Sequence, residues 1–316
     1  MGGKKYVITG AAGFLGQMLA RAILGHRHVR EVVLVDVIEP NNPGDSRAKC
    51  IKADLLNCDL GEIITEDVNV IYHLAAIVSS HAQEDFDLGM SVNFDLTRRL
   101  LETIRQTNPA IRFIFSSSLA VFGGLLPAKV MQDQAATPTS SYGTQKAMCE
   151  LLITDYSNKN YADGLVLRLP TISIRPGKPN KAASSFCSGI IREPLFGQES
   201  ICPCDKDLKL WLCSPQTAIG HFMHAVKVPK HALDKHPVIN VPGVSVSINE
   251  MLDALEAVAG KKARALVSFK KDPAIDSIVS SWPQNFDLTR AYSLGFRDDV
   301  PFKETVQNFF DTYVKG

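Results

Sequence analysis

The chain has 316 residues, 45% of them hydrophobic, and its 34 basic residues nearly balance its 33 acidic ones. This length and composition suit one large α/β unit or two closely packed domains, and the lack of a charge block excludes a nucleic-acid partner. No apolar run approaches the ~20 residues of a membrane span, and the first residues pass almost directly into a strand pattern. We therefore expect a cytoplasmic protein with no membrane partner.

The first half of the chain alternates strand and helix patterns. The expected elements are strands at 5–9, 31–36, 48–55, 68–76, 111–118 and 164–170, with helices at 14–24, 85–107 and 140–158. The strands are short, continuous apolar runs, as is typical of a parallel sheet covered on both faces. The order predicts a Rossmann-type, doubly wound α/β sheet over residues 1–170.

The pattern loosens after Pro170. Residues 173–205 are rich in Pro, Ser, Gly and Lys, and an irregular segment of this length is typical of a binding loop. A strand near 236–243 should return to the sheet, and a helix is expected at 247–260. The second domain, residues 171–316, is therefore predicted to be mostly a smaller α/β substrate-binding region.

A glycine-rich turn follows the first strand. TGAAGFLG places Gly10, Gly13 and Gly16 immediately before the first helix, where close backbone approach and free N–H groups suit a pyrophosphate. Asp36 ends the second strand, and a carboxylate there accepts hydrogen bonds from the adenosine ribose. Because no cation stands beside this acid to attract a 2′-phosphate, the predicted cofactor is NAD.

A Tyr and a Lys share one face of the helix expected at 140–158. Tyr142 and Lys146 are four residues apart, and a nearby ammonium group lowers the pKa of a phenol. Ser116 to Ser118 end the fifth strand, at the sheet edge where ligands of open α/β folds bind. A serine there can hold a substrate oxygen while the tyrosine transfers its proton.

These motifs together resemble the extended short-chain dehydrogenase/reductases, which include nucleotide-sugar epimerases and dehydratases. The resemblance runs the length of the chain and includes TGAAGFLG, Asp36, HLAA at 73–76, FSSSLAVFG at 115–123 and Tyr142-Gly-Thr-Gln-Lys146. It implies that Ser118, Tyr142 and Lys146 are the catalytic residues. The residues implied to bind NAD are Gly10, Gly13, Phe14, Leu15, Gly16, Asp36, Asp54, Leu55, Leu74, Ala75, Ala76, Asn93, Ser116, Tyr142, Lys146 and Leu169.

The segment after Leu169 bears on the substrate. Its cations Arg175, Lys178, Lys181 and Arg192 suit a carboxylate or a phosphate, and their spacing does not separate the two. The segment resembles that of family members that oxidise the 2-hydroxyl of a small sugar acid, such as D-erythronate, with NAD. That resemblance implies a carboxylate bound by Arg175 or Arg192, and further substrate contacts from Ser118, Tyr142, Ser79, Ser80 and Thr171.

Two alternatives share this fold. One is a nucleotide-sugar epimerase or dehydratase with tightly bound NAD, and the other is a non-catalytic dinucleotide sensor, which the retained Tyr142 and Lys146 argue against. The resemblance also implies a homodimer formed through the helices at 85–107 and 140–158. No metal site is predicted, because Cys202-Pro-Cys204 lacks a second ligand pair.

Overall fold

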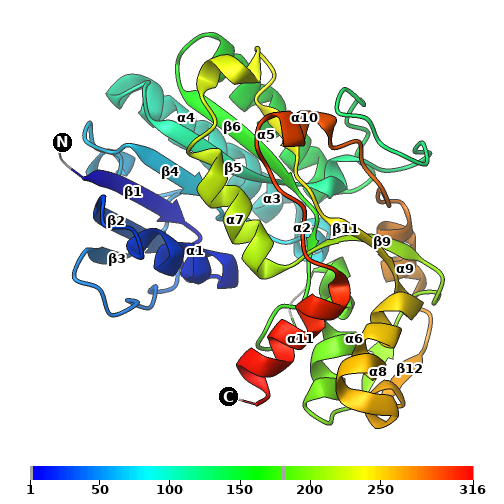
Figure 1. The fold of residues 1–316 in the computed structure, drawn as a ribbon. Helices are drawn as coiled ribbons and strands as arrows, with labels where there is room; N and C mark the ends of the chain where they lie inside the picture. Colours follow the sequence, from blue (N-terminus) through cyan, green and yellow to red (C-terminus); the bar gives the residue numbers. More distant parts are fainter. Residues whose placement is uncertain (1–2, 180–181, 316) are drawn as a thin grey trace.

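A seven-stranded parallel sheet forms the centre of the protein (Figure 1). The structure is a computed structural model that describes residues 3–179 and 182–315. The strand order is β10-β6-β5-β4-β1-β2-β3, so the direction of winding reverses between β1 and β4. The strands are β1 (Lys4–Thr9), β2 (Val29–Asp36), β3 (Ala48–Lys52), β4 (Val70–His73), β5 (Arg112–Ser118), β6 (Asp163–Leu169) and β10 (Val238–Asn240).

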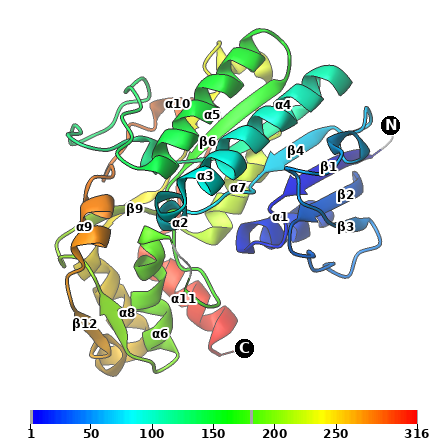
Figure 2. The same ribbon diagram turned by 180° about the vertical axis from the view of Figure 1, so that it is seen from behind.

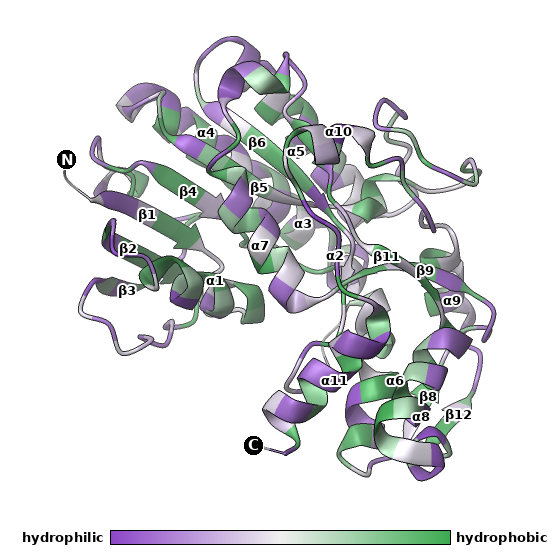
Figure 3. Cartoon of the chain, in the orientation of Figure 1, coloured by the Kyte–Doolittle hydropathy of each residue, from purple (hydrophilic) through white to green (hydrophobic). Residues whose placement is uncertain are grey.

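Helices cover both faces of this sheet, as the continuous apolar strands predicted. On one face α1 (Phe14–Leu24) packs beside α7 (Pro215–Ala225), and α4 (Leu96–Thr107) and α5 (Ser141–Asn158) cover the other (Figures 1 and 2). Figure 3 shows the hydrophobic second halves of β1 and β2 between these layers. The doubly wound fold is confirmed, and β10 returns to the sheet within the predicted span 236–243.

Two predicted elements differ in their limits. The helix expected at 85–107 is divided into α3 (Phe86–Gly89), a π-helical turn η2 (Met90–Asp95) and α4. The strand expected at 68–76 ends at His73. Residues 74–76 are apolar because they line a ligand cleft beyond the strand, and an apolar run does not distinguish these two situations.

The prediction of an irregular segment at 173–205 is wrong in part. It contains α6 (Phe186–Leu195), which shares a second core with α8 (Ile248–Arg264) and α11 (Phe302–Tyr313). This helix is buried on nearly every side, and it contains Gly189 and Pro194, residue types that indicate a loop in the sequence. The small strands around this core are β7 (Thr171–Ile172), β8 (Ser200–Cys202), β9 (Lys209–Cys213), β11 (Val244–Ser247) and β12 (Val267–Phe269).

Short helical elements complete the connections. They are α2 (Ser79–Glu84), α9 (Pro273–Ser280), α10 (Thr289–Ser293), η1 (Leu60–Glu62), η3 (Leu119–Val121), η4 (Ala183–Ser185) and η5 (Lys230–Leu233). Within the described ranges, none of the helices is both long and apolar enough to cross a membrane.

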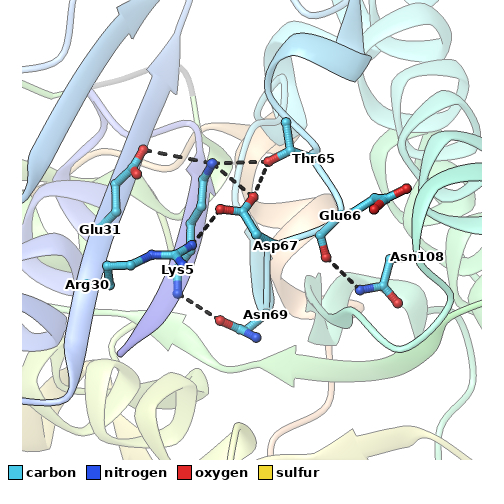
Figure 4. A network of polar contacts seen from close by, with 8 residues as sticks. All are labelled: Lys5, Arg30, Glu31, Thr65, Glu66, Asp67, Asn69 and Asn108. Carbon is cyan, nitrogen blue, oxygen red and sulfur yellow. Dashed lines mark hydrogen bonds and ion pairs between the residues drawn. The ribbon is translucent and has the colours of Figure 1, made fainter. Parts of the chain in front are cut away.

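A polar network closes the amino end of the sheet (Figure 4). Lys5 Nζ lies 3.0 Å from Thr65 Oγ1, 3.3 Å from Asp67 Oδ1 and 4.0 Å from Glu31 Oε1, while Arg30 pairs with Asp67 at 2.6 Å. These residues lie at the end of the strands opposite the serine triplet, so the network belongs to the scaffold. The site must be sought at the carboxyl ends.

Candidate active site

The glycine turn between β1 and α1 is shaped for close approach of a ligand backbone. Gly10 has φ +70°, and a Cβ there would lie 2.6 Å from the backbone nitrogen of Ala75. Gly13 is the N-cap of α1 and supplies no side-chain cap, so the first N–H groups of the helix face the cleft. These features fit a pyrophosphate, which would be held by the helix dipole and the open N–H groups.

A cleft of about 390 Å³ extends from this turn along the ends of β2 and β4. Asp36 lies in it, and its Oδ2 accepts a hydrogen bond of 3.0 Å from the backbone N–H of Ala12. The cleft is lined by the predicted residues Gly10, Gly13, Asp36, Asp54, Leu55, Leu74, Ala75 and Ala76. It suits the adenosine half of NAD, with the carboxylate of Asp36 placed for the ribose hydroxyls.

Replacing Asp36 with Ala should raise the KM for NAD about tenfold and reduce the preference of the enzyme for NAD over NADP. The carboxylate is the charged acceptor at the end of β2, and a hydrogen bond to a charged group contributes about 1.5–3 kcal/mol. Its loss also removes the repulsion of a 2′-phosphate. Steady-state kinetics with both cofactors measure this, with Glu39→Gln, an exposed acid outside the cleft, as the control for a general loss of negative charge. An unchanged KM for NAD would contradict the ribose role.

A second cleft of about 300 Å³ continues from the first, because both are lined by Gly10, Gly13, Leu74 and Ala76. It lies at the carboxyl ends of β5 and β6. The predicted residues that line it alone are Phe14, Leu15, Gly16, Ser79, Ser116, Ser118, Tyr142, Lys146, Leu169, Thr171 and Arg175. The structure thus gathers most of the expected nicotinamide and substrate residues in one place.

Helix α5 brings the tyrosine and lysine to this cleft. Gly143 lets the helix approach η3 closely, since a Cβ there would lie 2.1 Å from the carbonyl oxygen of Ala120. Lys146 is only 1% exposed, and its Nζ donates a 2.8 Å hydrogen bond to the carbonyl of Ser116. The same Nζ lies 4.5 Å from the centre of the Phe115 ring and 5.7 Å from that of Tyr142.

Burial dominates the protonation of both groups. Burial raises the pKa of Tyr142 to about 12, and the hydroxyl of Ser118 and the guanidinium of Arg175 offset part of that rise. Burial lowers the pKa of Lys146 to about 8, against the opposing influence of Cys149 and Glu150. Arg175 is thus a second cation that favours the phenolate, in addition to Lys146, whose Nζ lies near the phenol ring as the sequence predicted.

Three residues predicted to bind ligands do not line either cleft. Asn93 is buried, and its side-chain amide makes two hydrogen bonds to the backbone of Ile77. Oδ1 accepts from the N–H of Ile77 at 2.8 Å, and Nδ2 donates to the carbonyl of Ile77 at 3.1 Å, so Asn93 fixes the backbone beside the cofactor cleft. Ser80 lies in α2, outside the lining residues. Arg192 donates to the carbonyl of Arg175 and pairs with Glu193, which turns it away from the cleft. Lys181 lies outside the described residues.

Other lining residues were not predicted from the sequence. Trp282 follows α9 and lines the second cleft, and no local motif marks it. The predicted residue Ser79 also lines this cleft, where its Oγ accepts a 3.1 Å hydrogen bond from the backbone N–H of Ala183. Further unpredicted lining residues are Val78, Ser117, Leu119, Ala120, Pro170, Ile172, Ala182 and Ser184.

A nucleotide-binding turn, an acid at the end of β2 and a Tyr–Lys helix beside a serine define a short-chain dehydrogenase/reductase site. Residues 6–224 match the NAD dependent epimerase/dehydratase family. The chain belongs to this family, the extended short-chain dehydrogenase/reductases, and its cofactor is NAD.

Relatives extend over nearly the whole chain. It is 50% identical to the D-erythronate dehydrogenase of Haemophilus influenzae, over 97% of this chain and 99% of that protein. It is 43% identical to the D-erythronate dehydrogenase of Cupriavidus necator, over 96% and 97%. Among solved structures, the nucleoside-diphosphate-sugar epimerase from Agrobacterium tumefaciens is similar with a TM-score of 0.92, 39% identity, and coverage of 100% of this chain and 96% of that one.

Proposed function

We propose that the protein is an NAD-dependent dehydrogenase that oxidises the 2-hydroxyl of D-erythronate to a ketone. The observation that carries this proposal is the joint placement of Arg175, Tyr142 and Ser118 in one cleft of about 300 Å³. A guanidinium suits the carboxylate of a small acid, and the two hydroxyls suit its neighbouring alcohol. The 50% identity to a D-erythronate dehydrogenase supports the same substrate.

The residues of the chain have separable tasks in this reaction. Ser118 orients the substrate hydroxyl, and Tyr142 accepts its proton. Lys146, held by the carbonyl of Ser116, places a positive charge beneath the phenol ring. Arg175 binds the carboxylate and also favours the phenolate form of Tyr142. NAD, when bound, supplies a hydride acceptor for C2, and Tyr142 and Lys146 would hold its nicotinamide ribose.

A nucleotide-sugar epimerase is the second candidate, because of the 39% identity to the Agrobacterium protein. It would use the same Tyr142 and Lys146 and release no NADH. The homodimer implied by the family resemblance stays a prediction, as do the cytoplasmic location expected from the hydropathy of the sequence and the domain limits 1–170 and 171–316.

The test is NADH formation by the purified protein with NAD and a panel of D-erythronate, L-threonate, D-threonate, glycerate and a UDP-sugar. We expect NADH with D-erythronate and less with the other acids, because Arg175 recognises the shared carboxylate while the hydroxyl contacts discriminate configuration. NADH formation with none of the acids, together with isomerisation of the UDP-sugar, would overturn the proposal in favour of the epimerase.

A further inference from the structure

Helix α6 holds both backbone polar groups of Arg175. Ser188 Oγ accepts a 3.0 Å hydrogen bond from the N–H of Arg175, and Arg192 Nη1 donates one of 2.7 Å to its carbonyl oxygen. Ser188 and Arg192 are four residues apart, so they share one face of the helix. Two side chains from a single helix turn thus fix the backbone of a single cleft residue.

Contacts with the same helix also hold the residues that immediately precede Arg175. Ser173 Oγ donates a 3.0 Å hydrogen bond to the carbonyl of Cys187, and the N–H of Ser173 donates to the carbonyl of Cys213 in β9. Ile174, between them, is 2% exposed and belongs to the core around α6. Residues 173–175 are therefore anchored to the second core, whereas the catalytic Tyr142 is anchored to the sheet.

This arrangement requires a buried charge. Arg192 is 6% exposed and Ser188 fully buried. Arg192 is neutralised by Glu193 at 2.5 Å, and it lies near enough to Arg175 to add to the lowering of that residue's pKa, which burial mainly causes. Burying a guanidinium beside another cation is costly, and an apolar pair in place of both Arg192 and Glu193 would often stabilise the fold as well. The cost indicates that the exact position of Arg175 matters to the site.

We propose that Ser188 and Arg192 are positioning residues that set the location of the Arg175 guanidinium relative to Tyr142 and so determine the affinity for the substrate carboxylate. The inference rests on the function proposed above, in which Arg175 binds that carboxylate. A displacement of an anchoring group by about 1 Å is enough to weaken productive binding. Chemistry should be affected less than binding, since Tyr142 and Ser118 come from α5 and β5 and only the smaller influence of Arg175 on the Tyr142 phenolate would change.

The experiment is steady-state kinetics of D-erythronate oxidation by the full-length enzyme and its Arg175→Met, Ser188→Ala and Arg192→Met variants. We expect the KM for the acid to rise about 30-fold in Arg175→Met, about tenfold in Arg192→Met and about threefold in Ser188→Ala. In the Ser188 and Arg192 variants kcat should change less than about twofold, and the KM for NAD should stay unchanged. Ser188→Ala tests the inference if Arg192→Met does not fold.

Arg112→Met is the matched control. Arg112 is also buried, its Nη2 donates a 2.8 Å hydrogen bond to the carbonyl of Val228, and its Nε pairs with Asp163 at 2.9 Å, but it lies at the amino end of β5. Its loss should lower thermal stability without raising the KM for the acid. If Arg175→Met raises the KM for the acid but Ser188→Ala and Arg192→Met leave that KM unchanged, the positioning role is overturned. An unchanged KM in Arg175→Met would instead refute the proposed carboxylate contact.

Discussion

Replacing Tyr142 with Phe should lower kcat for D-erythronate oxidation by about 10³-fold while the protein stays folded. The substitution removes the only atom of this side chain that can accept the substrate proton, and it leaves the ring in place beside Lys146 and Ser118. The KM for NAD should rise only a few-fold, because one hydrogen bond to the nicotinamide ribose is lost while the glycine turn and Asp36 are untouched. Stopped-flow or steady-state NADH absorbance measures the loss, and thermal unfolding checks that the fold persists.

Tyr156→Phe provides the matched control on the same helix. Its hydroxyl donates a 3.2 Å hydrogen bond to Glu102 outside the cleft, so this variant should keep full activity.

The pH profile of the wild type adds a second measurement. Below about pH 8, kcat/KM should rise with pH as more Tyr142 loses its proton, and above it the gain is offset as Lys146, with a pKa of about 8, loses its charge. Retained activity in Tyr142→Phe would refute the proton-acceptor role.

Replacing Glu150 with Gln should lower the free energy of unfolding by about 3–5 kcal/mol, because it leaves a buried guanidinium without its anion. Glu150 accepts from Arg168 Nη2 at 2.6 Å and from Ser117 Oγ at 2.5 Å. Arg168 is 8% exposed, and its guanidinium lies 4.6 Å from the centre of the Phe122 ring. The pair therefore joins α5 to β5, to β6 and to the residue that follows η3.

Urea unfolding measures this change in the free energy of unfolding. A double variant tests whether the loss comes from the unpaired charge that the single substitution leaves behind. Glu150→Leu combined with Arg168→Met removes both charges and should recover most of the loss. Asp155→Asn is the control on the same helix: its 2.7 Å pair with Lys159 is exposed, so the expected cost is below about 1 kcal/mol. If Glu150→Gln and Asp155→Asn lowered the free energy of unfolding equally, the buried pair would contribute no more to stability than the exposed one.

The cofactor half of the site was predictable because its signals are local. A glycine turn of this kind lies between a strand and a helix, and Asp36 stands 26 positions after Gly10 at the end of the same strand–helix–strand unit of β1, α1 and β2, whose geometry is nearly invariant. The Tyr142–Lys146 pair is equally local, since helical spacing alone puts both on one face. For these elements the sequence determined the fold and the residues by itself.

The substrate half was decided by tertiary structure. Arg175 and Arg192 were equivalent candidates in sequence, and only the packing of α6 turned one toward the cleft and the other toward its neighbour's carbonyl. Trp282 reaches the cleft from more than 100 residues beyond Arg175, and the Glu150–Arg168 pair joins a helix to a strand. Such contacts depend on how separate elements pack, and a packing arrangement leaves no fixed spacing in the chain from which it could be read.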